Sequence, residues 1–217
     1  VSSGCSSSSS ESEEPTYESI ALVNARVFDG TGADPVEDSV IVIRDGRFEA
    51  VGRDIEVPSD AEVIDCDGRT VLPGLINAHV RGSLEPDVLE GWLAGGVTTV
   101  RDVHVDSSRV FELYTLRDEA DPNRARVISA GAMLTVPGGY PTIPFGFEAV
   151  EIESVDDTHR QVAISLGQGA DFVAIALEGG RDMSLATPEH PAPWPTLSDE
   201  HLEGILDEAD EADVVVA

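Results

Sequence analysis

The chain has 217 residues, 41% of them hydrophobic, which is enough apolar material for one sizeable core or parts of two. Acidic residues outnumber basic residues by 42 to 13, giving a formal net charge of -29, which argues against binding to a phosphate backbone. Nucleic acid is therefore not an expected partner. No stretch approaches the ~18 uninterrupted apolar residues of a membrane-spanning helix, so no transmembrane segment is expected.

The charged residues are unusual in kind as well as in number. All 13 basic residues are arginine, because the sequence contains no lysine. The excess acid is spread from Glu11 to Glu211 rather than confined to one tail. This pattern is typical of a protein kept soluble in concentrated salt, and it predicts a salt-adapted source organism.

Residues 1–19 form a polar, low-complexity segment in which VSSGC is followed by SSSSSESEEP. Such a run cannot pack a core and predicts a disordered tether. The small residues before Cys5 resemble a lipoprotein processing site, at which Cys5 would carry the lipid. Two interpretations stay open, a lipid anchor at Cys5 and a plain disordered tail, and the location stays open between extracytoplasmic and cytoplasmic. The second cysteine, Cys66, is expected to be buried in a strand.

Residues 20–72 predict several short strands with no helix between them. Asp45-Gly46 separates two alternating apolar runs, which is a strong hairpin signal, and Asp67-Gly68 predicts a second turn of this type. We therefore expect part of a small β-sandwich-like unit.

From residue 73 to residue 217, strand-like and helical runs alternate, which is typical of β/α units around a parallel sheet. The expected strands are GLINAHV, VTTVRDVHV, ARVISAGAML, ADFVAIALE and DVVVA, with a helical run between each pair. Before the last strand, Ser198 is expected to cap a helix, with Leu197 and Leu202 closing a hydrophobic staple. A closed (β/α)8 barrel takes ~250 residues, so the α/β fold predicted here is an incomplete barrel of about five strands.

Active sites in such barrels lie at the carboxyl ends of the strands, where the first expected strand places His79. A His-x-His pair there would direct both imidazoles to one face of the strand, where they could share a divalent metal ion. The second position is Arg81, which offers no lone pair and would repel a cation. His79 is thus either a single metal ligand or a hydrogen-bonded histidine of the rim.

Several motifs taken together resemble the amidohydrolase superfamily, in particular its imidazolonepropionase- and prolidase-like branch. They are LVNARVFDGTG, the DGR turns, TVLPGLINAHV, GVTTVRDV, VPGGYPT and GADFVAIALEGG, and they extend over residues 20–217. The resemblance implies a small β-sandwich followed by a (β/α)8 barrel that holds one or two zinc-like ions. It also implies that a metal-activated water hydrolyses a C–N bond in a small amide, a cyclic amide or a dipeptide.

Carried over residue by residue, the resemblance implies that His79 is a metal ligand and that Arg81 replaces the second histidine. Ala174 stands where this branch has a lysine that is carboxylated and bridges two metals. The other ligands, histidines on strands five and six and an aspartate on strand eight, would fall beyond Ala217. The cofactor of the family is zinc or another divalent metal, but a degraded metal site is expected in this chain, and no residue is assigned as catalytic.

The expected substrate-binding residues are Arg81, Gly138, Gly139 and Tyr140. The last three belong to a turn that resembles the substrate-side loop of the family, where glycines let the backbone approach a ligand, although a plain tight turn is the alternative. His104 lies near the same rim, but its spacing does not make it a ligand. The remaining polar residues considered are expected to be solvent-exposed without a role: His159, His190, His201, Asp102, Glu178 and Asp182.

Three hypotheses on function remain. The chain derives from a metal-dependent hydrolase of C–N bonds, or it is a non-catalytic binding protein, with or without the lipid anchor, in which Arg81 recognises a carboxylate, or it is a truncated product without activity. The degraded metal site and the incomplete barrel favour an inactive polypeptide with a hydrolase ancestry. In either of the first two cases, the expected partner is a small amide, a dipeptide or another small acid.

Overall fold

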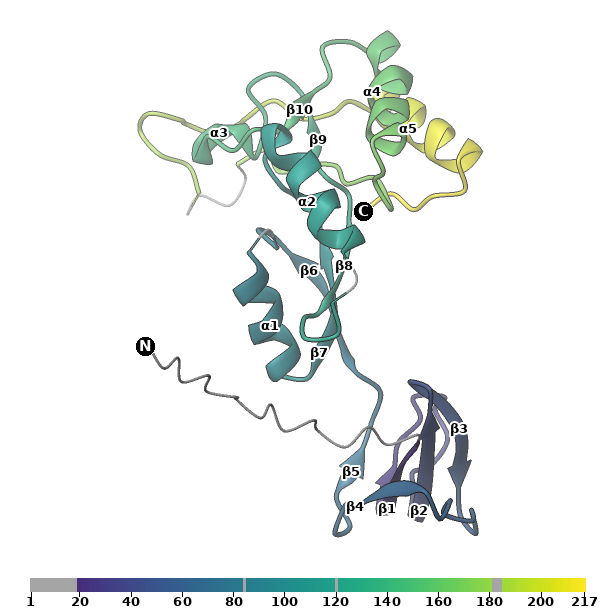
Figure 1. Ribbon diagram of the computed structural model, residues 1–217. Coiled ribbons are helices and arrows are strands. Elements are labelled where there is room, and N and C mark those ends of the chain that lie inside the picture. The colour runs from purple at the N-terminus through teal and green to yellow at the C-terminus, as the bar shows by residue number, and fades with distance from the viewer. Residues whose placement is uncertain (1–18, 84, 120, 181–184) are drawn as a thin grey trace, which may run out of the picture. The chain divides into compact units, whose positions relative to one another are not determined.

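The structure is a computed structural model in which residues 19–83, 85–119, 121–180 and 185–217 are described (Figure 1). Cys5, the expected tether and Asp182 lie outside these ranges. The chain divides into two compact units, residues 1–73 and 74–217, and each is treated by itself. Among the described helices, none is long and apolar enough to cross a membrane.

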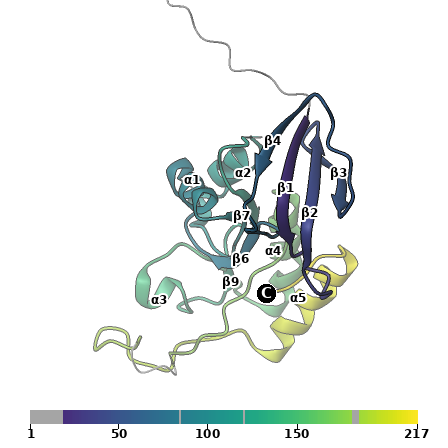
Figure 2. The same cartoon turned by 90° about the horizontal axis from the view of Figure 1, so that it is seen from below.

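The amino-terminal unit is a single mixed sheet centred on one strand. Its strands are β1 (Ser19–Val27), β2 (Val36–Arg44), β3 (Arg47–Gly52), β4 (Ala61–Asp65) and β5 (Thr70–Val71). The order is β3-β2-β1-β4, with β5 also paired to β1, and Figure 2 shows β1 to β4 side by side. The expected β-sandwich is not seen in residues 19–73, because all five strands belong to one hydrogen-bonded sheet and do not form two facing layers.

The two Asp-Gly turns of this unit have the same backbone but different roles. Asp45 and Gly46 have φ values of 50° and 69°, and they join β2 to β3 as the predicted hairpin. Asp67 and Gly68 also have positive φ, 52° and 72°. The predicted second turn is thus present, but it does not form a hairpin, because β4 and β5 both run parallel to β1 and pair with successive parts of it.

Cys66 follows β4 and is buried, as predicted. It packs with Ala25, Val27 and Ile41 in the apolar cluster of the sheet. Within the described part of the chain, its thiol is free.

The carboxy-terminal unit begins with the predicted β/α repeats. A parallel sheet in the order β6-β7-β8 is connected by α1 and α2 (Figure 1). The bounds are β6 (Leu75–Val80), α1 (Pro86–Ala94), β7 (Val97–Asp102), a 3-10 turn (Ser107–Arg109), α2 (Val110–Asp118) and β8 (Arg126–Ser129). Leu89, Val100 and Leu113 are fully buried between these helices and strands, and each such side chain stabilises the fold by roughly 1.5–3 kcal/mol.

The remaining elements continue the parallel order without closing it into a ring. They are β9 (Leu134–Thr135), α3 (Thr142–Phe145), β10 (Val150–Glu151), α4 (Val155–Gly167) and α5 (Asp199–Glu211). The fourth and fifth expected strands are present as isolated parallel bridges, one between Leu134 and Ile175 and one between Val173 and Val216. The fold is thus α/β with the expected strand order, and the barrel is not closed in the part of the chain that the structure describes.

Helices α4 and α5 lie side by side over an apolar cluster that contains Leu134, Val162 and Ile205 (Figures 1 and 2). Ser198 caps α5 by accepting a hydrogen bond from the backbone of His201, whose ring in turn bonds the backbone of Ser198. Leu197 and Leu202 belong to this cluster, in agreement with the predicted staple. His201 is therefore half-buried and caps the helix, which corrects the expectation of an exposed side chain without a role.

Candidate functional site

Two of the expected substrate-binding residues contact each other at the carboxyl ends of the strands. Arg81 directly follows β6, and Tyr140 lies in the segment that follows β9. The Nη1 atom of Arg81 donates a hydrogen bond of 2.5 Å to the Tyr140 hydroxyl, and its Cζ lies 5.3 Å from the centroid of the Tyr140 ring. Within the described ranges, no ion pair involves Arg81. Among the described residues, no carboxylate oxygen therefore lies within ion-pair distance of the Arg81 guanidinium.

Aromatic rings hold Tyr140 in place. Its ring stacks on Trp194 with centroids 6.5 Å apart and an interplanar angle of 16°, and it meets Phe145 edge-on at 5.9 Å. Phe145 in turn contacts Phe147 at 5.8 Å. Such contacts restrict the rotamers of the rings, so the Tyr140 hydroxyl is presented to Arg81 in one orientation.

The geometry of the turn before Tyr140 explains why both Gly138 and Gly139 are glycines. Gly139 N donates to Val136 O over 2.8 Å, and Gly138 has a φ of 72°, which is the third position of a type II turn with Pro137 at the second. A Cβ atom on Gly139 would lie 2.4 Å from Thr135 Oγ1, so only glycine fits there. The substrate-binding role of Gly138 and Gly139 stays a prediction.

His79 lies on β6 with an exposed side chain, and its backbone N–H donates to Asn77 Oδ1 over 3.2 Å. In residues 19–83, 85–119, 121–180 and 185–217, no group of three or more His, Cys, Asp or Glu side chains could hold a metal ion. His79 therefore belongs to no such group among the described residues, and its role as a metal ligand stays a prediction.

Asp102 is fully buried at the end of β7, so the expectation of an exposed charge is wrong for this residue. Its two carboxylate oxygens accept backbone hydrogen bonds from Ser83, over 2.8 Å, and from His104, over 2.9 Å. Burial raises the pKa of Asp102, while these hydrogen bonds and the charge of Arg81 act in the opposite direction. The carboxylate therefore joins the segments that follow β6 and β7.

His104 is the residue whose importance the sequence does not reveal. Its side chain is 4% exposed, and Nδ1 accepts a hydrogen bond of 3.2 Å from the backbone N–H of Met133. A neutral imidazole with an accepting Nδ1 carries its proton on Nε2, and this Nε2 has no hydrogen-bond partner among the described residues. Asp106 Oδ1 lies 3.9 Å away, which is too far for a hydrogen bond.

Two effects keep the His104 ring neutral. Burial first, and then the positive charge of Arg81, lower the pKa of His104 to about 4, against a smaller opposite effect of Asp106. The alternation in RDVHV does not single out this ring, because Val103 and Val105 are buried as well as Asp102 and His104. Near neutral pH, His104 is consequently a hydrogen-bond donor without a charge.

A cavity of about 240 Å³ opens beside His104, and we name it the mouth cavity. Its walls include Arg81, His104, Asp106, Arg109 and Phe147. Because Arg81 follows β6 and His104 follows β7, the mouth cavity lies at the carboxyl ends of these strands, which is where barrel enzymes bind their substrates.

Comparison with known proteins identifies the family. No protein-family model matches the chain. A dihydroorotase of Syntrophotalea carbinolica is 34% identical over 186 residues, which cover 79% of this chain and 42% of that protein. An imidazolonepropionase of Methylobacterium nodulans is 48% identical over 65 residues, or 28% of this chain and 16% of the relative. The crystal structure of a putative prolidase from Bifidobacterium longum superposes with a TM-score of 0.72 and 28% identity, covering 93% of this chain and 49% of that one.

The chain belongs to the amidohydrolase superfamily. It spans less than half the length of these relatives. Proteins of this superfamily are generally metal-dependent, but the described residues do not fit a metal centre. Ala174, in the place expected for the bridging lysine, is 1% exposed and packs among Val103, Met133 and Phe172. Because the surroundings of Ala174 are apolar and Arg81 is cationic, we derive no metal-dependent step from these residues.

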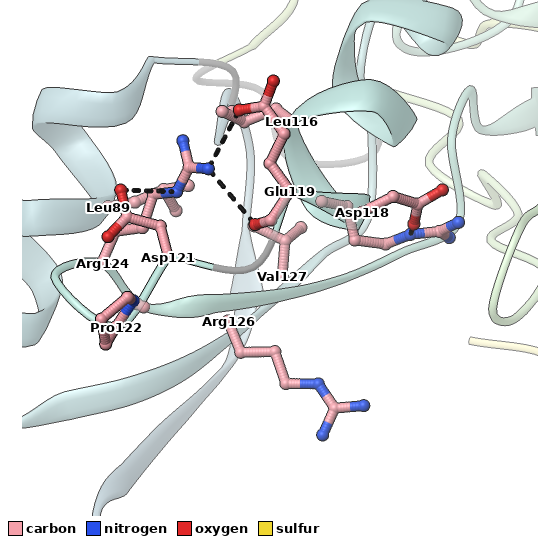
Figure 3. Close-up of a pocket in the computed structure, with 11 residues that line it drawn as sticks. Leu89, Leu116, Asp118, Glu119, Asp121, Pro122, Arg124, Arg126 and Val127 are labelled. Atoms are coloured by element: carbon pink, nitrogen blue, oxygen red, sulfur yellow. Dashed lines mark hydrogen bonds and ion pairs between the residues drawn. The ribbon is translucent and has the colours of Figure 1, made fainter.

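Another cavity of this amidohydrolase unit, about 490 Å³, lies at the opposite end of the strands, and we name it the bottom cavity (Figure 3). It is formed around the segment between α2 and β8. There the guanidinium of Arg124, 9% exposed, lies 3.1 Å from Glu119 Oε2 and 3.6 Å from Asp121 Oδ2. Figure 3 shows Arg124 between these two carboxylates. This end of a barrel usually contributes to the stability of the fold and not to catalysis, so the bottom cavity is not our candidate site.

Proposed function

We propose that this protein is a hydrolase of C–N bonds in small amides, cyclic amides or dipeptides, in which Arg81 and Tyr140 bind the substrate. The reaction rests on one observation, the similarity to dihydroorotases and other amidohydrolases over most of the chain. The contact between Arg81 and Tyr140 supports their assignment to substrate binding. A guanidinium fixed at the carboxyl ends of the strands recognises a carboxylate well, and it is unsuited to holding a metal ion.

An assay of the purified protein with and without added zinc tests this proposal. The substrates are dipeptides, N-acyl amino acids and a cyclic amide, and the release of amine is followed. We expect turnover of at least one substrate that carries a free carboxylate, and a higher KM for that substrate in Arg81→Met. Absence of turnover for every substrate, with and without zinc, would contradict the proposed reaction.

A second candidate function is binding without hydrolysis, and the position of Arg81 favours it. A cation in the place of the second histidine, with no cluster of metal-binding side chains in the described ranges, leaves recognition as a task that these residues can perform alone. Arg81→His separates the candidates, because it creates a His-x-His pair with His79. If loss of the metal ligand is what prevents hydrolysis, Arg81→His should bind more zinc than the parent protein and gain activity.

A further inference from the structure

We propose that the mouth cavity binds the carboxylate group of a small aromatic acid. The carboxylate would lie between the guanidinium of Arg81 and the Nε2–H of His104, with the ring of the acid against Phe147. The proposal deepens the proposed function, since this acid would be the recognised end of the substrate, and it rests on that function only for this biological meaning.

The first argument is an excess of hydrogen-bond donors in the cavity. His104 Nε2–H is buried and has no acceptor within the described part of the chain. Arg81 has five N–H donors, of which one bonds the Tyr140 hydroxyl, and it takes part in no described ion pair. A buried donor without a partner destabilises the chain, so a ligand that supplies an acceptor removes this unfavourable contribution.

The second argument is that the nearby acid is already engaged elsewhere. Asp106 Oδ1 accepts a hydrogen bond of 2.9 Å from the backbone N–H of Glu148, while Ser107 N donates to Glu148 O over 2.8 Å. These bonds fix the segment around Asp106 and leave its carboxylate 3.9 Å from His104 Nε2. Asp106 therefore does not use the Nε2–H of His104, which lines the mouth cavity.

Charge and shape set the class of ligand. Arg109, also in the wall, pairs with Glu112 over 2.9 Å and with Glu85 over 3.6 Å, so Arg81 is the cation that remains available. One cation and one neutral donor match the two oxygens of a monoanionic carboxylate better than the higher charge of a phosphate. The ring of Phe147, with its centroid 6.0 Å from that of His104, offers an apolar wall to the rest of the ligand.

Isothermal titration calorimetry with the purified chain tests the site, using benzoate and uncharged benzamide as probes. We expect benzoate to bind and benzamide to bind at least about tenfold more weakly, because a charge-assisted hydrogen bond contributes more than a neutral one. Arg81→Met should weaken benzoate binding by about tenfold or more. The matched control is Arg126→Met, which removes an exposed arginine at the bottom cavity and should leave the affinity unchanged.

Two variants of His104 isolate its Nε2–H. His104→Asn retains an acceptor for the Met133 N–H but has no donor at the position of Nε2, so benzoate affinity should fall about fivefold. His104→Gln places an amide N–H near the position of Nε2 and should bind more tightly than His104→Asn. If the two variants bind equally, the Nε2–H does not hold the ligand.

Asp106→Asn gives a change in the opposite direction, which a misfolded protein could not produce. The amide oxygen still accepts from Glu148, while the negative charge beside the carboxylate is removed, so benzoate affinity should rise two- to fivefold, on the order of 0.5–1 kcal/mol. The proposal is overturned if wild type does not prefer benzoate to benzamide, or if Arg81→Met binds like Arg126→Met. Hydrolysis is measured in a separate assay, so benzoate binding without turnover would contradict the proposed reaction and not this site.

Discussion

The mouth cavity and the bottom cavity lie at opposite ends of the same strands, and both are lined by arginine. At the bottom, Arg124 is nearly buried and bonds the carboxylates of Glu119 and Asp121. At the mouth, Arg81 is exposed and takes part in no described ion pair, and it lies beside His104, whose Nε2–H has no partner among the described residues. The two cavities thus differ in whether carboxylate acceptors lie beside the arginine, and not in whether an arginine is present.

This comparison shows how a stabilising charge differs from one that is available to a ligand. A guanidinium whose donors are all bonded within the chain holds two segments together, and its removal leaves buried or crowded carboxylates. A guanidinium with free donors adds little to stability but can bind an anion. The size of a cavity does not distinguish the two, because the bottom cavity is the larger one.

The largest effect we expect is a pH-dependent loss of stability that originates at His104. Its pKa is about 4 in the folded chain, below the ordinary value of 6.5. The unfolded chain therefore binds a proton in this interval that the folded chain does not bind. The contribution of His104 to stability is complete above pH 6.5 and is lost as the pH falls through 4, and it amounts to roughly 2–3 kcal/mol.

Urea unfolding of wild type and His104→Asn at several pH values, in constant salt, measures this contribution. The difference in unfolding free energy between the two proteins should shrink as the pH falls from 6.5 towards 4, because asparagine does not titrate. Acidic groups such as Asp102, whose raised pKa has the opposite sign, occur in both proteins and largely cancel. A difference that is constant with pH would show that the ring of His104 is not buried as described.

A smaller effect is expected from Arg124→Met at the bottom cavity. This variant removes the bonds to Glu119 and Asp121, and it leaves their like charges close together without a cation. Since the two carboxylates are partly exposed, we expect a loss of about 1–2 kcal/mol in the unfolding free energy, measured in urea. Arg126→Met is the matched control and should change stability by less than about 0.5 kcal/mol. Equal effects of the two variants would remove the distinction between the bonded and the free arginine.

Much of the fold could be predicted from local patterns. The order of strands and helices after residue 73 follows from alternating apolar runs, and Ser198 identifies the start of α5 by its capping chemistry. The missed elements, α3, β9 and β10, are each two to four residues long, which is too short to produce a period. The turn at Asp67-Gly68 does not predict a hairpin reliably, because a tight turn does not determine which strands the residues before and after it pair with; here both pair with β1.

The site was less predictable, because it depends on contacts between distant segments. The position of Arg81 at a strand end could be read from the sequence, but its hydrogen bond to Tyr140 joins residues 59 apart. The ring of His104 is fixed by its Nδ1 atom, which accepts a hydrogen bond from the backbone N–H of Met133, 29 residues away. Nothing in the local sequence indicates that His104 Nε2 would remain unpaired, since this follows from the geometry of Asp106 and Glu148.

The smallest effect concerns Tyr140, which we regard as a positioning residue for Arg81. Tyr140→Phe retains the stack on Trp194 and the contact with Phe145, and it removes only the hydroxyl that Arg81 bonds. Because this bond is exposed, the unfolding free energy should change by less than about 0.5 kcal/mol. Benzoate affinity should nevertheless fall two- to threefold, about 0.4–0.7 kcal/mol, because the guanidinium must then be ordered by the ligand itself. If Tyr140 had only a structural role, Tyr140→Phe would lower stability and leave benzoate affinity unchanged. Phe145→Leu is the matched control, because it removes an aromatic contact of Tyr140 and leaves the hydroxyl in place.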